Sequence, residues 1–297
     1  PTRKVGTMGS SHFSNQDLEN IYQLLADEDQ TTFSLLQPPL MKRDFALDTM
    51  LERAARDSNP VRSQNALNLL QQKFGAEAEK SFVEFLAQHR GTLDLAEALI
   101  HLSSTEYPRI DSERYRDTLA QWTAHAKELC SPKQDTETNL VAFHKLFFEQ
   151  LGLTGNEADY YDPRNSYLFD VIDRRIGSPI ALCSLYLILG QQIGLPLVGV
   201  GMPGHFLVRF QSPRYSTFID VFNQGKELNK EECMAYCHKA GYGYMSEYLS
   251  PVTPRGILAR TCCNLMLIYA DNQDQRKVHR FQKFLVELGS LPTQFGE

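Results

Sequence analysis

The sequence predicts an α+β protein with a helical amino-terminal domain, a central buried helix packed on a small antiparallel sheet, and a helical hairpin at the carboxy terminus. Three observations support this. Amphipathic segments with three- and four-residue spacing, which are typical of helices, fill the amino-terminal third. One almost wholly apolar helix follows, and three short runs rich in Val, Ile, Phe and Thr come directly after it. Such an order of elements favours an α+β architecture.

Composition narrows the possible partners. The chain has 297 residues, of which 42% are hydrophobic, and a net charge of -6. It can bury a sizeable core, but it has no basic field that would attract phosphates or anionic lipids. We therefore expect no nucleic acid and no membrane as partner. No apolar run approaches the roughly 20 residues that span a bilayer, and the amino end lacks the apolar centre of a secretory signal. A cytoplasmic location is expected.

The six cysteines predict reduced thiols, because they lie mostly in helical or apolar text without the even framework of a small secreted domain. Cys233 and Cys237 are four residues apart, with His238 adjacent, but no second pair of ligands follows at a usable spacing. We expect no metal and no cofactor.

Four regions are expected along the chain. Residues 1–13 are polar and rich in Gly and Ser, which indicates a disordered or added tail. Residues 14–106 form an all-helical domain with a weak helical-repeat character. It opens with a capping box at Ser14 and includes two helical segments, 60–74 and 78–89, separated at Gly75.

Residues 107–250 are expected to form the α+β domain. Ser178 is a good N-cap, Pro179 suits the first helical position, and the apolar text runs to Gly194. Nearly every residue of 180–189 is apolar, which predicts the central helix of this domain. Three strands, within 195–202, 205–210 and 215–222, are expected to form an antiparallel meander on that helix. Residues 251–297 resemble one tetratricopeptide-like hairpin that caps the domain.

The candidate chemistry lies where this helix and the strands meet. A helix amino terminus lowers the pKa of a thiol placed on it. His205 starts the second predicted strand and Asp220 lies on the third. A histidine can take the thiol proton and an aspartate can orient the imidazole, so a cysteine, a histidine and an aspartate in this order make an acyl-transfer site.

Four separated motifs occur in order: "YYDPRNSYL", "RRIGSPIAL", "GLPLVGVGMPGHFLVRF" and "IDVFNQGKEL". They resemble the SirB-type regulator family, whose core is similar to the transglutaminase-like superfamily and is often followed by tetratricopeptide-like helices. The resemblance implies a nucleophilic cysteine at the start of the central helix, with the histidine and the aspartate on adjacent strands. It also implies a regulatory association.

The sequence departs from the catalytic pattern at the nucleophile. Counted back from Gly194, that position falls on or beside Pro179, which has no thiol. Two residues could replace it. Cys183 lies one turn further along the same helix face, about 6 Å deeper, where an apolar setting would raise its pKa and make it inert. Ser178 offers a hydroxyl, although N-capping explains it without catalysis.

The remaining candidates have two readings each. His205 is either a catalytic base or a structural partner of Asp220 that holds the sheet to the helix. A loop before the central helix carries further candidates for ligand or partner contact, although turn formation and capping also explain the last two. These loop residues are Tyr160, Tyr161, Asp162, Asn165 and Ser166.

Two functions follow. The leading hypothesis is a non-catalytic transglutaminase-like protein that acts as a regulatory or protein-interaction module, with a protein as its partner. The alternative is an amidase or acyl-transferase that uses Cys183 or Ser178 with His205 and Asp220.

Overall fold

The computed structural model describes residues 13–29, 37–131, 133–243 and 245–289. The expected tail therefore lies outside the described residues, except for Phe13. The chain forms two compact units. Unit 1 comprises residues 1–82 and 104–111, and unit 2 comprises residues 83–103 and 112–297. The domain boundaries expected after residues 13, 106 and 250 stay predictions.

Unit 1 is helical. Its helices are α1 (Asn15–Leu24), α3 (Phe45–Ala54) and the first part of α4 (Pro60–Gln88). The capping box expected at Ser14 is confirmed, because its hydroxyl accepts from the amide of Asp17 and the Asp17 carboxylate accepts from the amide of Ser14. The apolar faces of these helices form one core, which includes Leu25, Leu47 and Leu70.

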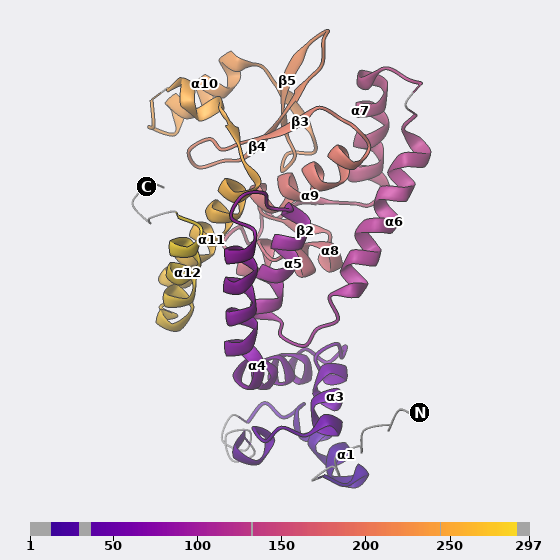
Figure 1. Ribbon diagram of the computed structural model, residues 1–297, viewed down its shortest axis with the longest axis vertical. Coiled ribbons are helices and arrows are strands. Elements are labelled where there is room, and N and C mark those ends of the chain that lie inside the picture. The colour runs from indigo at the N-terminus through magenta and orange to yellow at the C-terminus, as the bar shows by residue number, and fades with distance from the viewer. Residues whose placement is uncertain (1–12, 30–36, 132, 244, 290–297) are drawn as a thin grey trace, which may run out of the picture. The chain divides into compact units, whose positions relative to one another are not determined.

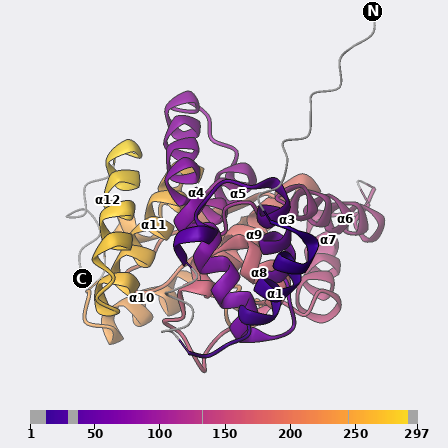
Figure 2. The same ribbon diagram turned by 90° about the horizontal axis from the view of Figure 1, so that it is seen from below.

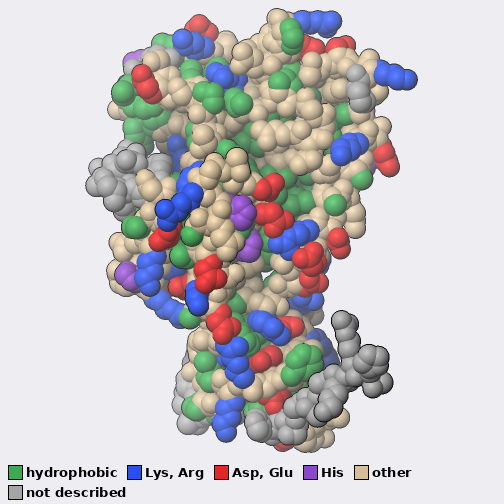
Figure 3. All heavy atoms as spheres, in the orientation of Figure 1, with side chains coloured by type: hydrophobic (Ala, Val, Ile, Leu, Met, Phe, Trp, Pro, Cys, Tyr) green, Lys and Arg blue, Asp and Glu red, His purple; other side chains and the backbone are tan. Residues whose placement is uncertain are grey.

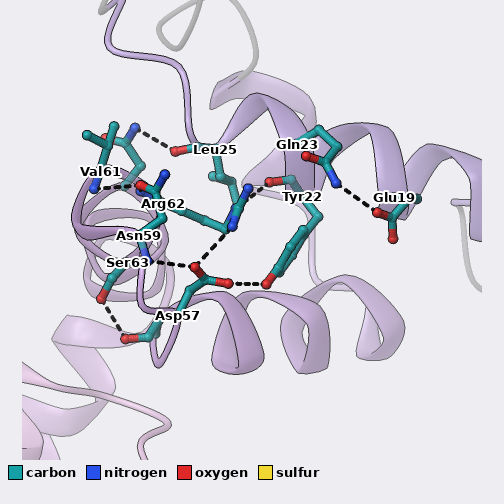
Figure 4. Close-up of polar contacts among 11 residues, drawn as sticks. Glu19, Tyr22, Gln23, Leu25, Asp57, Asn59, Val61, Arg62 and Ser63 are labelled. Atoms are coloured by element: carbon teal, nitrogen blue, oxygen red, sulfur yellow. Dashed lines mark hydrogen bonds and ion pairs between the residues drawn. The ribbon is translucent and has the colours of Figure 1, made fainter.

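A polar network ties α1 and the start of α4 to the turn that follows α3. Figure 4 shows the Tyr22 hydroxyl and the Arg62 guanidinium both pointing at the carboxylate of Asp57. Arg62 also donates to the carbonyl of Tyr22 and stacks on its ring, with the guanidinium 4.4 Å from the ring centroid. The network fixes the turn between α3 and α4 and satisfies polar groups that the turn partly buries.

Helix α4 differs from the sequence expectation. It is one helix of 29 residues, Pro60–Gln88, where two segments were expected with a break at Gly75. The Gln71 side chain packs beside Gly75, since a Cβ added there would lie 2.7 Å from its Nε2. A glycine inside a helix costs only about 1 kcal/mol. Burial of Phe74, Phe82 and Leu86 along the same helix outweighs this cost.

Unit 2 contains the α+β core, with the sheet and α9 in contact (Figure 1). Its helices are α5 (Leu95–Glu106, in part), α6 (Glu113–Leu129), α7 (Thr136–His144), η1 (Lys145–Gln150), η2 (Pro163–Asn165), α8 (Leu168–Arg174), α9 (Pro179–Gln192), α10 (Lys230–Lys239), η3 (Ser246–Leu249), α11 (Pro254–Asp271) and α12 (Gln275–Glu287). Its strands are β1 (Thr154–Gly155), β2 (Ile176–Gly177), β3 (Leu197–Val200), β4 (Leu207–Gln211), β5 (Ser216–Asp220), β6 (Lys226–Leu228) and β7 (Pro251–Val252).

The main sheet has the strand order β6-β5-β4-β3-β7, and every neighbouring pair in it is antiparallel. The expected meander is β3-β4-β5, with Val198 opposite Arg209 and Val208 opposite Ile219. Strands β6 and β7, which the sequence analysis missed, extend it at both edges. The predicted fold class, α+β with a helix on a small antiparallel sheet, is confirmed.

Helix α9 is the centre of unit 2. It contacts β3, β4, α6, α8 and α11, and its residues from Pro179 to Leu187 are all buried. Gly190 lets β3 approach, because a Cβ there would lie 2.4 Å from a Leu197 methyl carbon. Gly194 has φ +80° and ends the helix in the left-handed conformation, as expected.

The carboxy-terminal helices α11 and α12 form the expected hairpin and lie side by side in both Figure 1 and Figure 2. Thr253 caps α11 by accepting from the amide of Gly256, and Tyr269 stacks on Phe281 across the hairpin. Among the described residues, no helix is long and apolar enough to cross a membrane. Figure 3 shows acidic and basic side chains interspersed on the face it presents.

Candidate functional site

The start of α9 carries no thiol. Pro179 is its first residue and is buried. Ser178 takes the N-cap position, with φ -74° and ψ 162°, but the expected side-chain cap is wrong, because its hydroxyl makes no cap hydrogen bond. That hydroxyl lies 3.3 Å from the Ser166 hydroxyl, and both residues are buried. The backbone amide of Ser178 donates to the Asn165 carbonyl over 2.8 Å, which fixes the entry into the helix.

Cys183 lies one turn deeper in α9 and is fully buried. Its thiol donates to the carbonyl of Phe206, with Sγ 3.3 Å from the oxygen. Burial raises the pKa of this thiol well above its ordinary value, and the nearby Asp220 carboxylate raises it further. A thiolate at this position is therefore strongly disfavoured.

His205 lies in the turn between β3 and β4, two residues before β4 begins. The amide of His205 donates to the Met202 carbonyl, and Gly204 supplies the positive φ of +70° that the turn needs. Nε2 of His205 lies 3.0 Å from Oδ2 of Asp220, and the two side chains are 9% and 8% exposed. The contact lacks the alignment of a hydrogen bond, so it is a close polar approach.

Asp220 ends β5 and accepts two hydrogen bonds from Asn223, one from its amide over 3.2 Å and one from its side chain over 2.8 Å. Burial alone would raise the pKa of Asp220, but His205 and the Asn223 donors outweigh it and hold the pKa below its usual value. The sheet therefore presents an ionised carboxylate beneath the imidazole.

Asn165 and Asp162, two of the predicted loop residues, form hydrogen bonds and ion pairs with other residues of the chain. The buried Asn165 amide donates to the carbonyls of Asp159 and Tyr160 and accepts from the Asn156 side chain. Asp162 caps η2 and forms ion pairs with Arg164 and Arg174, over 2.8 and 3.2 Å. These contacts hold the loop in place.

Four tyrosines with exposed side chains are linked to the His205 turn directly or through neighbouring rings, and we call them the tyrosine rim. They are Tyr160, Tyr161, Tyr236 and Tyr242. Tyr160 contacts Tyr161, with ring centroids 5.1 Å apart, and also packs edge-on to Phe222. Phe222 in turn packs edge-on to His205.

The other side of the rim approaches the same turn. The Tyr236 ring centroid lies 5.5 Å from that of His205. A Cβ added to Gly204 would lie 3.8 Å from the hydroxyl oxygens of both Tyr236 and Tyr242. Tyr161 is 71% exposed, so the rim can be reached from solvent.

Arg260, on α11, completes the site. Its Nη2 donates to the carbonyl of His205 over 3.1 Å and to the carbonyl of Met202. Sequence reasoning missed Arg260, Phe222 and the tyrosines of and after α10. One signal was present, because Arg260 is the single charged residue in the otherwise uncharged text "GILARTCC", and a charge inside a buried helix face calls for a partner.

The geometry brings His205 and Asp220 together. Within the parts of the chain that the structure describes, neither the Cys183 thiol nor the Ser178 hydroxyl hydrogen-bonds to the imidazole, and each has a different partner. Cys233 and Cys237 lie in an apolar cluster with Met202. No group of three or more metal-ligating side chains occurs among the described residues.

Comparison with known proteins agrees with this fold. The family model of the transglutaminase-like superfamily matches residues 113–263. A UPF0162 protein of Xylella fastidiosa (strain Temecula1) is 36% identical over 68% of this chain and 74% of its own length. A UPF0162 protein of Vibrio cholerae is 30% identical over 44% of this chain and 49% of its own length.

A shorter match is found to a much longer protein. Human F-box only protein 21 is 39% identical over 32% of this chain but only 16% of its own length. No solved structure matches significantly. From the family match and the long alignment with the Xylella protein, the chain belongs to the transglutaminase-like superfamily and, within it, to the UPF0162 family.

Proposed function

We propose that this chain is a non-catalytic transglutaminase-like protein whose tyrosine rim binds a segment of a partner protein, and that it acts as a regulatory module. The assignment to the SirB-type branch of regulators is part of this proposal and depends on the four motifs described above. The single observation that carries the proposal is that α9 begins at Pro179, where an enzyme of this fold needs a nucleophile.

The state of Cys183 supports the absence of catalysis. A thiol that attacks a carbonyl must be ionised and must reach both its base and its substrate. The Cys183 thiol is buried, its pKa is raised, and its proton is directed at the Phe206 carbonyl. Reaching His205 would require this contact to break and the thiol to move.

The tyrosine rim supports binding. Tyrosine is enriched at protein interfaces because its rigid ring buries a large area and its hydroxyl still forms hydrogen bonds. Soluble proteins seldom leave several large aromatic side chains exposed together without a use for them. The F-box only protein 21 alignment adds support, because a segment related to this chain forms a small part of a much longer protein.

A peptide selection tests the proposal. A random peptide library displayed on phage is selected on the immobilised full chain, and the dissociation constant of each recovered peptide is measured by fluorescence polarisation. We expect Tyr161→Ala to weaken binding at least about tenfold, since a central interface tyrosine often contributes this much. Tyr161 is mostly exposed, so the fold should tolerate its removal.

Tyr215→Ala is the matched control. Tyr215 is also partly exposed, but it packs on Phe210 near the β4–β5 turn and makes no ring contact with the rim. It should leave affinity unchanged. The proposal fails if no peptide is recovered, if both variants bind like the natural protein, or if the recovered peptides are cleaved or acylate the protein.

A further inference from the structure

Arg260 is a cation at the Met202–His205 turn that no carboxylate of the described residues pairs with. Arg260 forms no ion pair with any carboxylate of the described residues, whereas Arg62, Arg116 and Arg164 each form at least one. Its hydrogen bonds go to the carbonyls of Met202 and His205. Burial lowers the pKa of Arg260. A partly buried charge without a counter-charge is unfavourable, so this arrangement needs a reason.

Arg255, on the same helix, is a guanidinium whose hydrogen bonds and charge are balanced within the chain. It too donates only to carbonyls, which are those of Leu288, Glu287 and His89. The first two belong to the carboxy-terminal end of α12, where the helix dipole is negative and stabilises a cation. The carbonyls that face Arg260 belong to a turn, which offers no such dipole.

Arg260 is also close to the rim. Burial raises the pKa of Tyr160, and Arg260 opposes this by stabilising the phenolate. Tyr160 and Tyr242 in turn raise the pKa of Arg260, against the effect of burial. The geometry agrees, because Arg260 donates to the carbonyls of Met202 and His205, and the Tyr242 hydroxyl lies near Gly204 in the same turn. Asp220 is the nearby carboxylate, but it is directed at His205 and Asn223.

We propose that Arg260 binds the carboxylate of an Asp or Glu side chain in the partner segment that occupies the tyrosine rim. The hydroxyls of Tyr160 and Tyr242 are the neighbouring donors for the same group. The partner is thus an acidic peptide segment. This inference depends on the proposed binding function and adds the chemistry of its ligand.

Two contacts hold the Arg260 guanidinium in place for this role. A Cβ added to Gly201 would lie 2.7 Å from Nη1 of Arg260, so the glycine lets the guanidinium lie against the turn. The guanidinium also lies 5.7 Å from the centroid of the Phe206 ring. These contacts orient the cation before a ligand arrives, which reduces the entropy lost on binding.

The test uses the peptides from the selection. We expect an acidic residue at one shared position, and replacing it by Gln or Asn in a synthetic peptide should weaken binding to the natural protein about tenfold. Arg260→Gln should bind the acidic and the amide peptide equally. Arg260→Lys should keep part of the preference, because it retains the charge but loses the planar donor geometry.

Arg255→Gln is the matched control, since it removes a carbonyl-bound guanidinium from the same helix, and it should keep the full preference. A measurement on the natural protein does not depend on any variant folding. Raising NaCl from about 50 to 500 mM should weaken binding of the acidic peptide and leave binding of the amide peptide unchanged. The inference is overturned if selected peptides bind without a preference for the acid, or if Arg260→Gln retains it. Recovery of no peptide overturns the proposed function as well.

Discussion

The site has a half formed by the start of α9 and a half formed by the sheet, and the two differ in how far their side chains are already bonded within the chain. On the helix half, Ser178, Pro179 and Cys183 are buried, and the hydroxyl and the thiol each have a partner inside the chain. On the sheet half, His205 and Asp220 form a close pair beneath a rim of partly exposed tyrosines. The helix half thus has its hydroxyl and its thiol engaged within the chain, whereas the sheet half lies beside partly exposed tyrosines.

The largest expected effect concerns the thiols. All six cysteines are buried, and the pKa of Cys183 is raised. We predict that a thiol reagent at pH 7.5 modifies the native protein about a thousandfold more slowly than the unfolded protein, because modification requires opening of the structure. Stopped-flow absorbance with a disulfide reagent measures both rates. A single fast thiol that maps to Cys183 would reverse the assignment of the helix half.

The next effect concerns His144, which packs against Tyr186 of α9 on the helix half. Burial lowers the pKa of His144 from 6.5 to about 4. The folded state disfavours the charged form, so this contribution to stability is complete above pH 6.5 and is lost as the pH falls toward 4. We predict a loss of about 3 kcal/mol over this window.

Urea denaturation of the natural protein and of His144→Leu measures this loss. The variant should be less sensitive to pH between 6.5 and 4, whatever its absolute stability. Asp220 cannot mimic the effect, because its lowered pKa acts only below the ordinary aspartate range. If the free energy of unfolding changes equally with pH in the two proteins, His144 is not the source of the pH dependence.

On the sheet half, Asp220→Ala should cost about 1–3 kcal/mol, because it leaves the two Asn223 donors without their acceptor and removes the carboxylate beside the buried His205 imidazole. Chemical denaturation at pH 7 measures the difference. Glu113→Ala is the control, since its ion pair with Arg116 is exposed and should contribute less than about 1 kcal/mol. If both variants lose similar free energy of unfolding, the buried contacts of Asp220 contribute no more to stability than an exposed ion pair.

The smallest effect is at Ser178. Its hydroxyl does not cap α9, so Ser178→Ala should cost only a few tenths of a kcal/mol. Thr253→Ala removes a real cap from α11 and should cost about 1 kcal/mol. Thermal unfolding of the two variants side by side separates these values. A larger loss at Ser178 would show that its contact with Ser166 contributes more than a cap does.

The sequence could predict the elements that depend on local pattern. The apolar run of α9, its proline start and its glycine end are local signals, and so are the three central strands and the pair His205 and Asp220. The helix break at Gly75 was wrong because packing along α4 outweighs the weak preference of one glycine. Strands β6 and β7 were missed because, at three and two residues, they show no alternation.

The rest of the site depends on contacts between distant segments. Tyr236 on α10 contacts His205, Tyr242 after α10 lies near Gly204 of the same turn, and Arg260 on α11 donates to the His205 carbonyl. Spacing in the chain cannot predict such contacts. Ser178 was misjudged for a similar reason, because its N-cap position was right but Ser166 takes its hydroxyl.

The central claim is that the site binds without reacting. The most direct measurement is the intact mass of the full chain and of a selected peptide, taken by mass spectrometry after prolonged incubation at binding concentrations. The account predicts that both masses stay unchanged while the complex remains detectable under native conditions. A cleaved or deamidated peptide, or an acyl adduct on Cys183 or Ser178, would contradict it.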